Sequence, residues 1–230
     1  MKKIMILSLL FAFTSLAQSE PGLQMQIPPW EKAKITPVGN VFRVEGKSTR
    51  MDLNSRKAKL VAIGQKVFQE SSFLTTNKAI LSLKLDGNTY LRLGKDSKVM
   101  VTLELDQKKW VIYLYNGTAK INFKPNKKIE RVIMRSAYAE LEGTDGKYML
   151  TFNPILCITS AVSQRGKLKF YNRQHPEENE VLEDGEYSYV DKLMDGPADE
   201  EMLEGKRLTD FLTSFKLTKE DLKEDEGMEE

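Results

Sequence analysis

The sequence predicts an all-β protein whose many short strands form either a β-sandwich or a β-solenoid-like stack. Apolar and polar residues alternate over short runs, which is the period of a half-buried strand. Turn residues separate these runs at close, regular intervals as far as Val190. Both architectures alternate with period two and turn on glycine, so this pattern favours neither of them.

The first 17 residues predict a secretory signal peptide. Lys2 and Lys3 precede a short apolar run, and Ser15 and Ala17 are small residues of the kind found before a cleavage site. We therefore expect cleavage after Ala17 and a periplasmic protein with no stable membrane insertion. A signal left uncleaved would instead anchor the protein.

Residues 18–39 contain four prolines and little periodicity, which predicts an extended N-terminal strap. Residues 40–192 form the expected all-β domain, and residues 46–56 are a polar loop or hairpin tip within it. The expected strands are residues 41–45, 59–63, 66–68, 72–74, 79–85, 89–93, 98–105, 109–115, 118–123, 129–134, 138–141, 147–152, 155–161, 167–171, 180–182 and 186–190.

Two hairpins stand out among these strands. Leucines alternate with polar residues in 79–85 and again in 89–93, and Asp86-Gly87-Asn88 separates the two runs. Asn116-Gly117 separates 109–115 from 118–123 and is a strong signal for a type I′ turn. We expect the chain to reverse at both places.

Residues 193–230 are expected to form an acidic and partly helical C-terminal tail. Its Leu208, Phe211, Leu212 and Phe215 stand at the spacing of one face of an amphipathic helix. From Asp195 onward there are 13 acidic and 5 basic residues, a net charge of −8, whereas residues 18–194 carry a net charge of +8. The tail could screen the basic body or act as an interaction arm.

The chemistry-bearing residues predict neither catalysis nor a bound cofactor or metal. The chain has one histidine, His175, in a polar loop, and one cysteine, Cys157, in an apolar run. His-based triads, Cys–His dyads and multi-cysteine zinc sites are therefore nearly excluded. Cys157 lies in an apolar run and is expected to be a buried small hydrophobe without a disulfide. Glu140 and Glu142 share one face of a strand, which favours a solvated face over a glycosidase pair.

Residues 110–115 are apolar or aromatic on both faces of their expected strand. Tyr113 and Tyr115 share a face, so they either pack in the core or form a flat stacking surface for a sugar or peptide. They are the candidate binding residues of the domain, as Phe211 and Phe215 are of the tail. A basic run from Lys124 to Arg135 is by default a solvated face, and as a binding site it suits an anionic envelope polymer or the acidic tail better than nucleic acid.

A series of turn and strand motifs follows in order from Gly39 to Tyr187. They are residues 39–41, 61–64, 73–76, 79–93, 116–121, 137–144, 166–170 and 181–187. In this order they resemble the FecR domain, the extracytoplasmic β-rich domain of bacterial FecR-type proteins. The resemblance implies a FecR-like β-sandwich or solenoid-like stack, and it rests on turn and core positions, so it supports architecture more than a site.

The resemblance also implies a role in binding. Classical FecR regulators join a cytoplasmic sigma-factor-holding segment and a membrane span to a periplasmic sensing domain, whereas this chain begins with a signal peptide. We therefore expect a non-enzymatic periplasmic binding or scaffolding protein, whose partner is an envelope protein or a cell-wall polymer and not nucleic acid. The alternative is an envelope signalling component that senses a receptor or transducer module. A cell-wall carbohydrate enzyme is the least supported reading.

Overall fold

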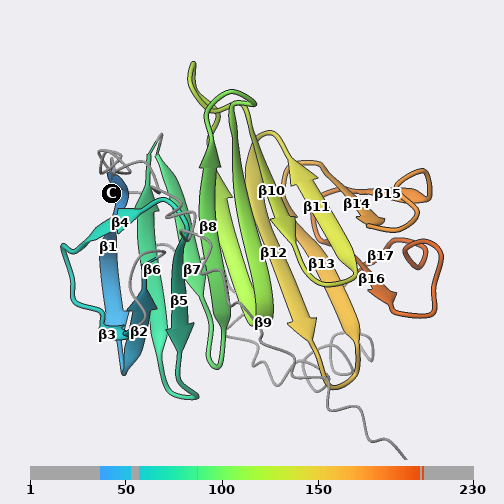
Figure 1. The fold of residues 1–230 in the computed structure, drawn as a ribbon. Coiled ribbons are helices and arrows are strands. Elements are labelled where there is room, and N and C mark those ends of the chain that lie inside the picture. The colour runs from blue at the N-terminus through green and yellow to red at the C-terminus, as the bar shows by residue number, and fades with distance from the viewer. Residues whose placement is uncertain (1–36, 53–56, 87, 203, 205–230) are drawn as a thin grey trace, which may run out of the picture. The chain divides into compact units, whose positions relative to one another are not determined.

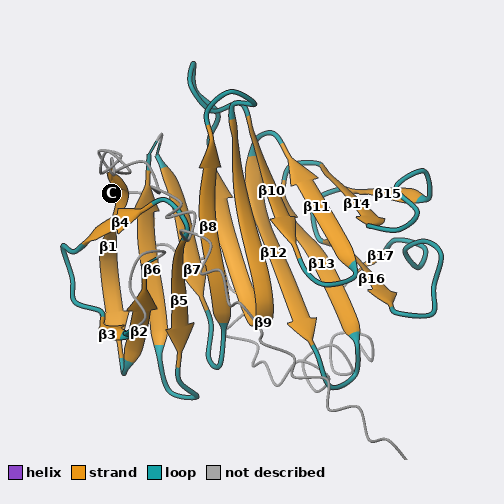
Figure 2. Ribbon diagram, in the orientation of Figure 1, coloured by secondary structure: helices purple, strands orange, loops and turns teal. Residues whose placement is uncertain are grey.

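The computed structural model describes residues 37–52, 57–86, 88–202 and 204, and these residues form strands and connecting loops without a helix (Figure 2). The all-β prediction is therefore confirmed. The predicted helical part of the tail lies outside the described residues. Among the described residues there is consequently no helix long and apolar enough to cross a membrane.

The strands pair into two sheets. Sheet A has the order β4–β1–β6–β7–β9–β12–β13–β16–β17, and sheet B has the order β3–β2–β5–β8–β9–β10–β11–β14–β15. The strands are β1 (Pro37–Glu45), β2 (Ser48–Met51), β3 (Lys59–Leu60), β4 (Lys66–Phe68), β5 (Ser71–Thr75), β6 (Ile80–Leu85), β7 (Thr89–Leu93), β8 (Lys98–Glu104), β9 (Lys109–Phe123), β10 (Arg131–Arg135), β11 (Ala139–Gly143), β12 (Gly146–Asn153), β13 (Ile158–Arg165), β14 (Leu168–Asn172), β15 (Asn179–Leu182), β16 (Glu186–Asp191) and β17 (Glu201–Met202).

The two sheets form the layers of a sandwich through which the chain advances from one end to the other. After β9 the chain forms two strands in one sheet and then two in the other, and each new pair lies next to the strands already present in its sheet (Figure 1). All described pairings are antiparallel except β9 with β10. A β-solenoid stacks parallel coils, so the antiparallel pairing favours a sandwich over a solenoid-like stack. The strands of this sandwich nevertheless follow one another along the domain in chain order, as those of a solenoid do.

One strand, β9, belongs to both sheets. Its first half pairs with β8 and β10 in sheet B, and its second half pairs with β7 and β12 in sheet A. The predicted reversal at Asn116-Gly117 is therefore wrong. Gly117 does adopt a positive φ of 86°, but this bend carries the strand from one sheet to the other instead of folding it back.

Close packing explains why glycine is needed at this crossing. A Cβ on Gly117 would lie 2.4 Å from Ser97 Oγ and 2.8 Å from the Asp96 carbonyl oxygen. The Asn116 side chain donates a hydrogen bond of 2.7 Å to that same Asp96 oxygen. The Asn-Gly pair thus fixes β9 against the turn that precedes β8.

Both sheets turn their alternating apolar residues toward a single core. From sheet A these include Leu83, Leu91 and Ile121, and from sheet B they include Phe73 and Trp110, all at most 1% exposed. The expected hairpin of residues 79–93 is confirmed, because Leu85 pairs with Thr89 and Leu81 with Leu93. Asn88 takes the positive φ of its turn, at 59°.

Two local predictions are wrong. Residues 48–51, expected in a polar loop, form β2 and pair with β5. Residues 155–157, expected in a buried strand, form the turn before β13, where Ile155 is 86% exposed and Cys157 is half-buried with a φ of 57°. Asn153 explains the turn, since its Oδ1 accepts the backbone N–H groups of Ile155 and Leu156.

Candidate binding surface

The first half of β9 places its two tyrosines on the outer face of sheet B. Trp110, Ile112 and Leu114 point into the core and are at most 1% exposed. Tyr113 is half-buried and Tyr115 is 45% exposed on the opposite face. This half of the strand therefore has one core face and one face on which the aromatic rings remain accessible.

Tyr113 lies in a row of side chains that runs across four neighbouring strands. The strand register places Tyr113 of β9 opposite Arg135 of β10, Arg135 opposite Glu140 of β11, and Glu140 opposite Tyr171 of β14. The guanidinium carbon of Arg135 lies 5.8 Å from the centroid of the Tyr113 ring, and its Nη1 donates a hydrogen bond of 3.4 Å to the Tyr113 hydroxyl. Such a contact combines cation–π attraction with a hydrogen bond.

Glu140 links Arg135 to Tyr171. Arg135 Nε donates to Glu140 Oε2, and the Tyr171 hydroxyl donates to Glu140 Oε1. Both carboxylate oxygens thereby accept a hydrogen bond, as the polar atoms of a buried side chain require. The four side chains Tyr113, Arg135, Glu140 and Tyr171 are called the sheet B row below.

Two side chains of the row, Tyr171 and Arg135, have raised pKa values. Burial, and then the hydrogen bond to Glu140, raise the pKa of Tyr171 well above its ordinary value. For Arg135, burial by itself would lower the pKa, but the hydrogen bond to Glu140 and its charge outweigh burial, so the pKa of Arg135 is raised. Tyr171 is therefore neutral and Arg135 positively charged at neutral pH.

Tyr115 lies beyond the row, near the end of the face. Lys98 Nζ lies 5.3 Å from its ring centroid, and its hydroxyl lies 4.0 Å from Met100 Sδ. Burial, with a smaller contribution from the charge of Tyr113, raises the pKa of Tyr115. Two tyrosines with a basic side chain over each ring thus lie two positions apart on one strand.

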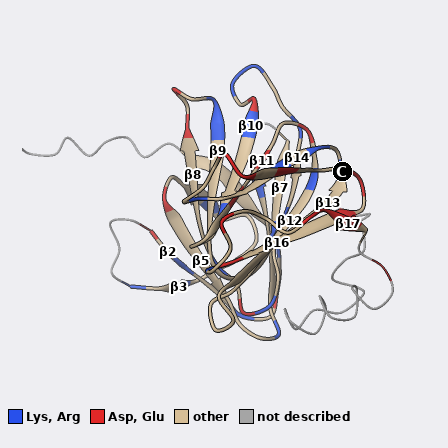
Figure 3. Cartoon of the chain, turned by 90° about the vertical axis from the view of Figure 1, so that its right-hand side faces the viewer, with Lys and Arg blue, Asp and Glu red and all other residues tan. Residues whose placement is uncertain are grey.

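Ion pairs flank the sheet B row. Arg131 Nη1 lies 2.8 Å from Glu142 Oε1, and Lys109 Nζ lies 3.1 Å from Glu104 Oε2. Between these pairs and the row, Val111 and Ile133 are 0% and 4% exposed. Figure 3 shows Lys and Arg residues at the ends of β9 and β10, where their connecting segment lies.

The carboxylates Glu140 and Glu142 do share a strand face, but Glu140 is not solvated as expected. It is 6% exposed because Arg135 and Tyr171 lie against it. Each glutamate pairs with an arginine of β10. The pair therefore serves the packing of this face, and its charges are compensated within the sheet.

Sequence reasoning missed that Arg135, Glu140, Tyr171 and Tyr113 come together. Alternation assigns each of them to a face of its strand, but not to a neighbour. Glu140 and Tyr171 are separated by two intervening strands, β12 and β13, that pair in the other sheet. The opposite charges at positions 135 and 140 on either side of a short turn were the one local signal available.

The remaining candidate residues lie elsewhere. Phe211 and Phe215 are outside the described residues. His175 is partly exposed in a loop, with its ring nitrogens 3.5 Å from Glu177 and 3.7 Å from Asp195. In the part of the chain that the structure describes, no three His, Cys, Asp or Glu side chains are grouped so as to hold a metal ion.

Comparisons with known proteins give a family match over part of the chain and a likeness of fold. The family model described as FecR protein matches residues 71–151. A crystal structure described as a "putative anti-sigma factor" from Parabacteroides distasonis ATCC 8503, at 2.50 Å, is similar with a TM-score of 0.50 and 14% identity, covering 61% of this chain and 63% of that one. A second structure of the same description, at 1.65 Å, gives 0.49 and 14%, covering 60% and 62%.

The chain thus spans less than two thirds of the length of that structural neighbour, and at 14% identity the likeness concerns the fold alone. No curated protein matches the sequence significantly. The matched residues 71–151 run from β5 into β12 and include both halves of β9 as well as Arg135 and Glu140 of the sheet B row. Residues 71–151 of this chain therefore match the FecR family model.

Proposed function

We propose that this protein is a non-enzymatic binding protein of the cell envelope, whose FecR domain recognises another envelope protein through the outer face of sheet B. The observation that carries the proposal is the sheet B row together with Tyr115. Tyrosine and arginine dominate the energetics of protein interfaces, because each offers a large, partly apolar contact and a polar group. Here they lie on adjacent strands of one sheet, which positions them before a partner arrives.

The rigidity of this surface supports binding without chemistry. Arg135 is held by Glu140 and Tyr113, so little side-chain freedom remains to be lost on association. Glu140 is occupied by Arg135 and Tyr171, which leaves it unsuited to deliver or accept a proton in a reaction. An extended segment of a partner, or a sugar ring of a cell-wall polymer, would stack on Tyr113 and Tyr115.

Signalling is the second candidate function, in which the partner is a receptor or a membrane transducer. The FecR family match and the anti-sigma-factor description of the structural neighbour favour it. In this reading the sheet B row would receive the periplasmic module of the transducer. Export of the chain, expected from residues 1–17, would place the FecR domain in the compartment where such a module lies.

The test is an affinity recovery from envelope extract with the mature protein, residues 18–230, as bait. Tyr115→Ala and Arg135→Ala are compared with Tyr189→Ala, a control on β16 of sheet A whose tyrosine is 39% exposed. A partner that the control retains and both sheet B variants lose supports the proposal. Equal recovery by all four proteins contradicts it.

The identity of the recovered partner distinguishes the two readings. A receptor or inner-membrane transducer favours signalling, whereas a wall-bound protein or wall fragments favour a scaffold. Release of soluble fragments from purified cell wall by the protein itself would instead indicate a carbohydrate enzyme and overturn the non-enzymatic assignment.

A further inference from the structure

The last strands of the two sheets lie at the same end of the domain. β14 and β15 end sheet B, and β16 and β17 end sheet A (Figure 1). Residues 192–200 connect β16 to β17 and are called the β16–β17 segment. This segment is tied to β16, because Ala198 donates a backbone hydrogen bond of 2.9 Å to the Tyr189 carbonyl oxygen.

The β16–β17 segment of sheet A also contacts sheet B. Asn172, the buried last residue of β14, donates a side-chain hydrogen bond to the Met194 carbonyl oxygen. Gly196 packs against the β14–β15 loop (residues 173–178), since a Cβ on Gly196 would lie 2.9 Å from the Cβ of Glu178. The segment therefore bridges the two sheets where the sandwich ends.

His175 of the β14–β15 loop lies between two carboxylates. Its Nε2 is 3.7 Å from Asp195 Oδ1 of the β16–β17 segment, and its Nδ1 is 3.5 Å from Glu177 Oε1 of its own loop. Both contacts are ion pairs only when the imidazole is protonated. A proton on His175 would thus attach the segment to sheet B by charge.

A second contact between the segment and sheet B joins two acids. Glu180 of β15 and Glu200 share a side-chain hydrogen bond, and the charge of Asp199 acts on the same group. Two carboxyl groups can form such a bond only while one of them carries a proton. Burial, then this hydrogen bond and the neighbouring negative charges, raise the pKa of Glu180.

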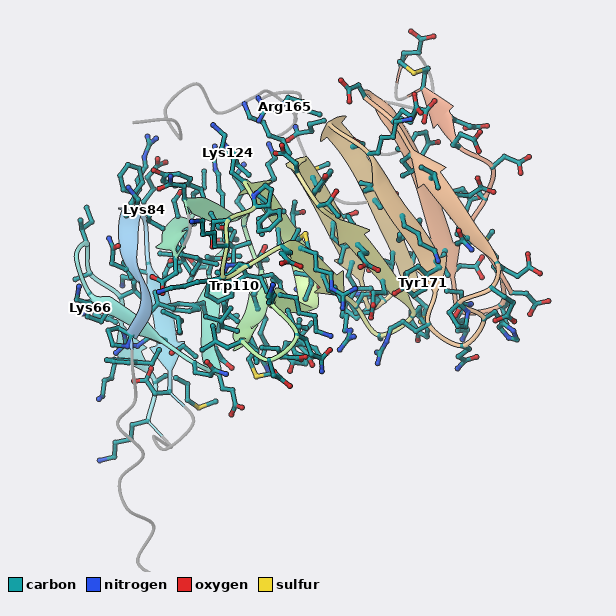
Figure 4. The ribbon with its side chains drawn as sticks, turned by 90° about the horizontal axis from the view of Figure 1, so that it is seen from above. Lys66, Lys84, Trp110, Lys124, Arg165 and Tyr171 are labelled. Carbon is teal, nitrogen blue, oxygen red and sulfur yellow. The ribbon has the colours of Figure 1, made fainter. Side chains whose placement is uncertain are left out.

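The groups that meet at this contact are mostly acidic. Sheet B contributes Glu177, Glu178 and Glu180, and the segment contributes Asp195, Asp199 and Glu200. The other charged residues of the two connections are Arg173, which donates to the Ser136 carbonyl oxygen, Asp191, which accepts from the Leu193 N–H, Glu201, which accepts from the Tyr187 hydroxyl, and the exposed Lys192. Figure 4 shows side-chain oxygens, in red, gathered around these last strands beyond Tyr171. Like charges that face each other repel, so added protons favour the contact.

Both protonated contacts respond to pH in the same direction. Histidine is the side chain whose charge ordinarily changes between about pH 5 and 8. The Glu180–Glu200 hydrogen bond is present while its proton is bound and is lost as the pH rises through the raised pKa of Glu180. Acidification therefore makes the contact attractive, and neutralisation leaves facing carboxylates.

The opposite end of the sandwich is joined by a group that does not titrate in this range. Arg50 of β2 in sheet B donates its Nη1 to the Lys66 carbonyl oxygen of β4 in sheet A. The Arg50 Nε lies 2.9 Å from Asp52 Oδ1. Arginine keeps its proton at every pH at which proteins fold, so this end provides a reference within the same molecule.

We propose that residues 192–200 are a pH-responsive clasp, which holds sheet A to the β14–β15 loop of sheet B in acidic medium and loosens as the medium becomes neutral. Loosening would release β17, which pairs with β16 only at Glu186–Met202 and Tyr187–Glu201. Its release would expose the edge of sheet A. This inference does not depend on the proposed function, because it concerns the end of the domain and not the outer face of sheet B.

The test is amide hydrogen exchange of the full mature chain, residues 18–230, with every rate divided by the intrinsic rate at the same pH. Peptides that cover residues 192–202 report on the clasp through the Ala198 hydrogen bond. Peptides that cover residues 37–45 report on the opposite end, where Val41 donates a backbone hydrogen bond of 2.8 Å to Gln65. We expect the clasp to be protected roughly fivefold more at about pH 5.5 than at about pH 7.5, the scale of an exposed ion pair, with no comparable change in residues 37–45. Equal protection at the two pH values, or an equal change at both ends, would overturn the proposal.

Three variants separate the clasp from a general effect of charge. His175→Gln cannot become charged and should lower the protection of residues 192–202 at about pH 5.5. Glu200→Gln can donate an amide hydrogen to Glu180 at any pH, so it should raise protection at about pH 7.5, which a loss of structure would not do. Glu183→Gln, which removes an exposed carboxylate that pairs with Lys167 at the same end, should keep the wild-type response. Lower protection of Glu200→Gln at both pH values, or loss of the response in Glu183→Gln, would contradict the clasp.

Discussion

Replacing Gly117 by alanine tests the crossing of β9 between the two sheets. Gly117 has a φ of 86°, and alanine in this left-handed region costs about 1–2 kcal/mol. Its Cβ would also lie 2.4 Å from Ser97 Oγ, 2.7 Å from Ser97 Cα and 2.8 Å from the Asp96 oxygen, two of which are backbone atoms. Overpacking of this kind costs about 1–3 kcal/mol more. We therefore expect the free energy of unfolding to fall by about 2–5 kcal/mol.

Gly64 provides the matched control. It has a similar φ of 80°, but a Cβ there would meet nothing within 4 Å. Gly64→Ala should cost only the conformational term of about 1–2 kcal/mol. Urea unfolding followed by far-UV circular dichroism measures both variants. Equal losses for the two would refute the account, because the close approach of β9 to the Asp96–Ser97 turn would then contribute nothing.

Three further predictions follow from the sheets. Glu140→Gln should lower the free energy of unfolding by about 2–3 kcal/mol, because it leaves the largely buried Arg135 without its counter-charge. Lys167→Gln, which removes the exposed pair with Glu183, should change the free energy of unfolding by less than about 1 kcal/mol in the same urea unfolding experiment. Similar losses for the two variants would contradict the assigned role of Glu140. The pKa of Tyr171 is raised from 10.0 in the folded state, so the unfolded chain loses this proton first, and the free energy of unfolding should fall as the pH rises above about 10. Tyr171→Phe should make this fall smaller when unfolding is measured from pH 8 to 11. A free energy of unfolding that depends on pH as steeply as in the wild type would count against the Tyr171–Glu140 hydrogen bond. Ile155→Ala should leave the free energy of unfolding within about 0.5 kcal/mol of wild type because the side chain is 86% exposed. Ile121→Ala, at a site 1% exposed, should lower it by about 2–5 kcal/mol in thermal or urea unfolding. A large loss for Ile155→Ala would contradict the exposed turn and favour the strand that the sequence predicted there.

The sequence predicted the parts of this fold that depend on neighbouring residues. Alternation identified the strands and their faces, and Asp86-Gly87-Asn88 identified a true hairpin. The same reasoning failed at Asn116-Gly117, because a positive φ bends the chain but does not say whether the next strand returns to the same sheet. It failed again at residues 155–157, where Asn153 caps a turn that apolar composition had concealed.

The candidate surface was predicted in the same partial way. Alternation put Tyr113 and Tyr115 on one face, and the structure leaves that face accessible at both rings. That Arg135, Glu140 and Tyr171 belong to this surface could be known only from the register of β9, β10, β11 and β14. One of these pairs, β9 with β10, is parallel. Another, β11 with β14, joins strands between which the chain forms two strands of the other sheet. Register between distant strands is set by the packing of the whole core, so no local pattern contains it.

Hydroxyl-radical footprinting of the protein with its recovered partner tests the proposed binding face most directly. Tyrosine oxidation is measured by mass spectrometry in the free and bound states. Binding through sheet B predicts that the partner protects Tyr113, Tyr115 and Tyr171 and leaves Tyr189 of sheet A as reactive as before. Protection of Tyr189 with no change at the three sheet B tyrosines would contradict the assignment of the binding surface.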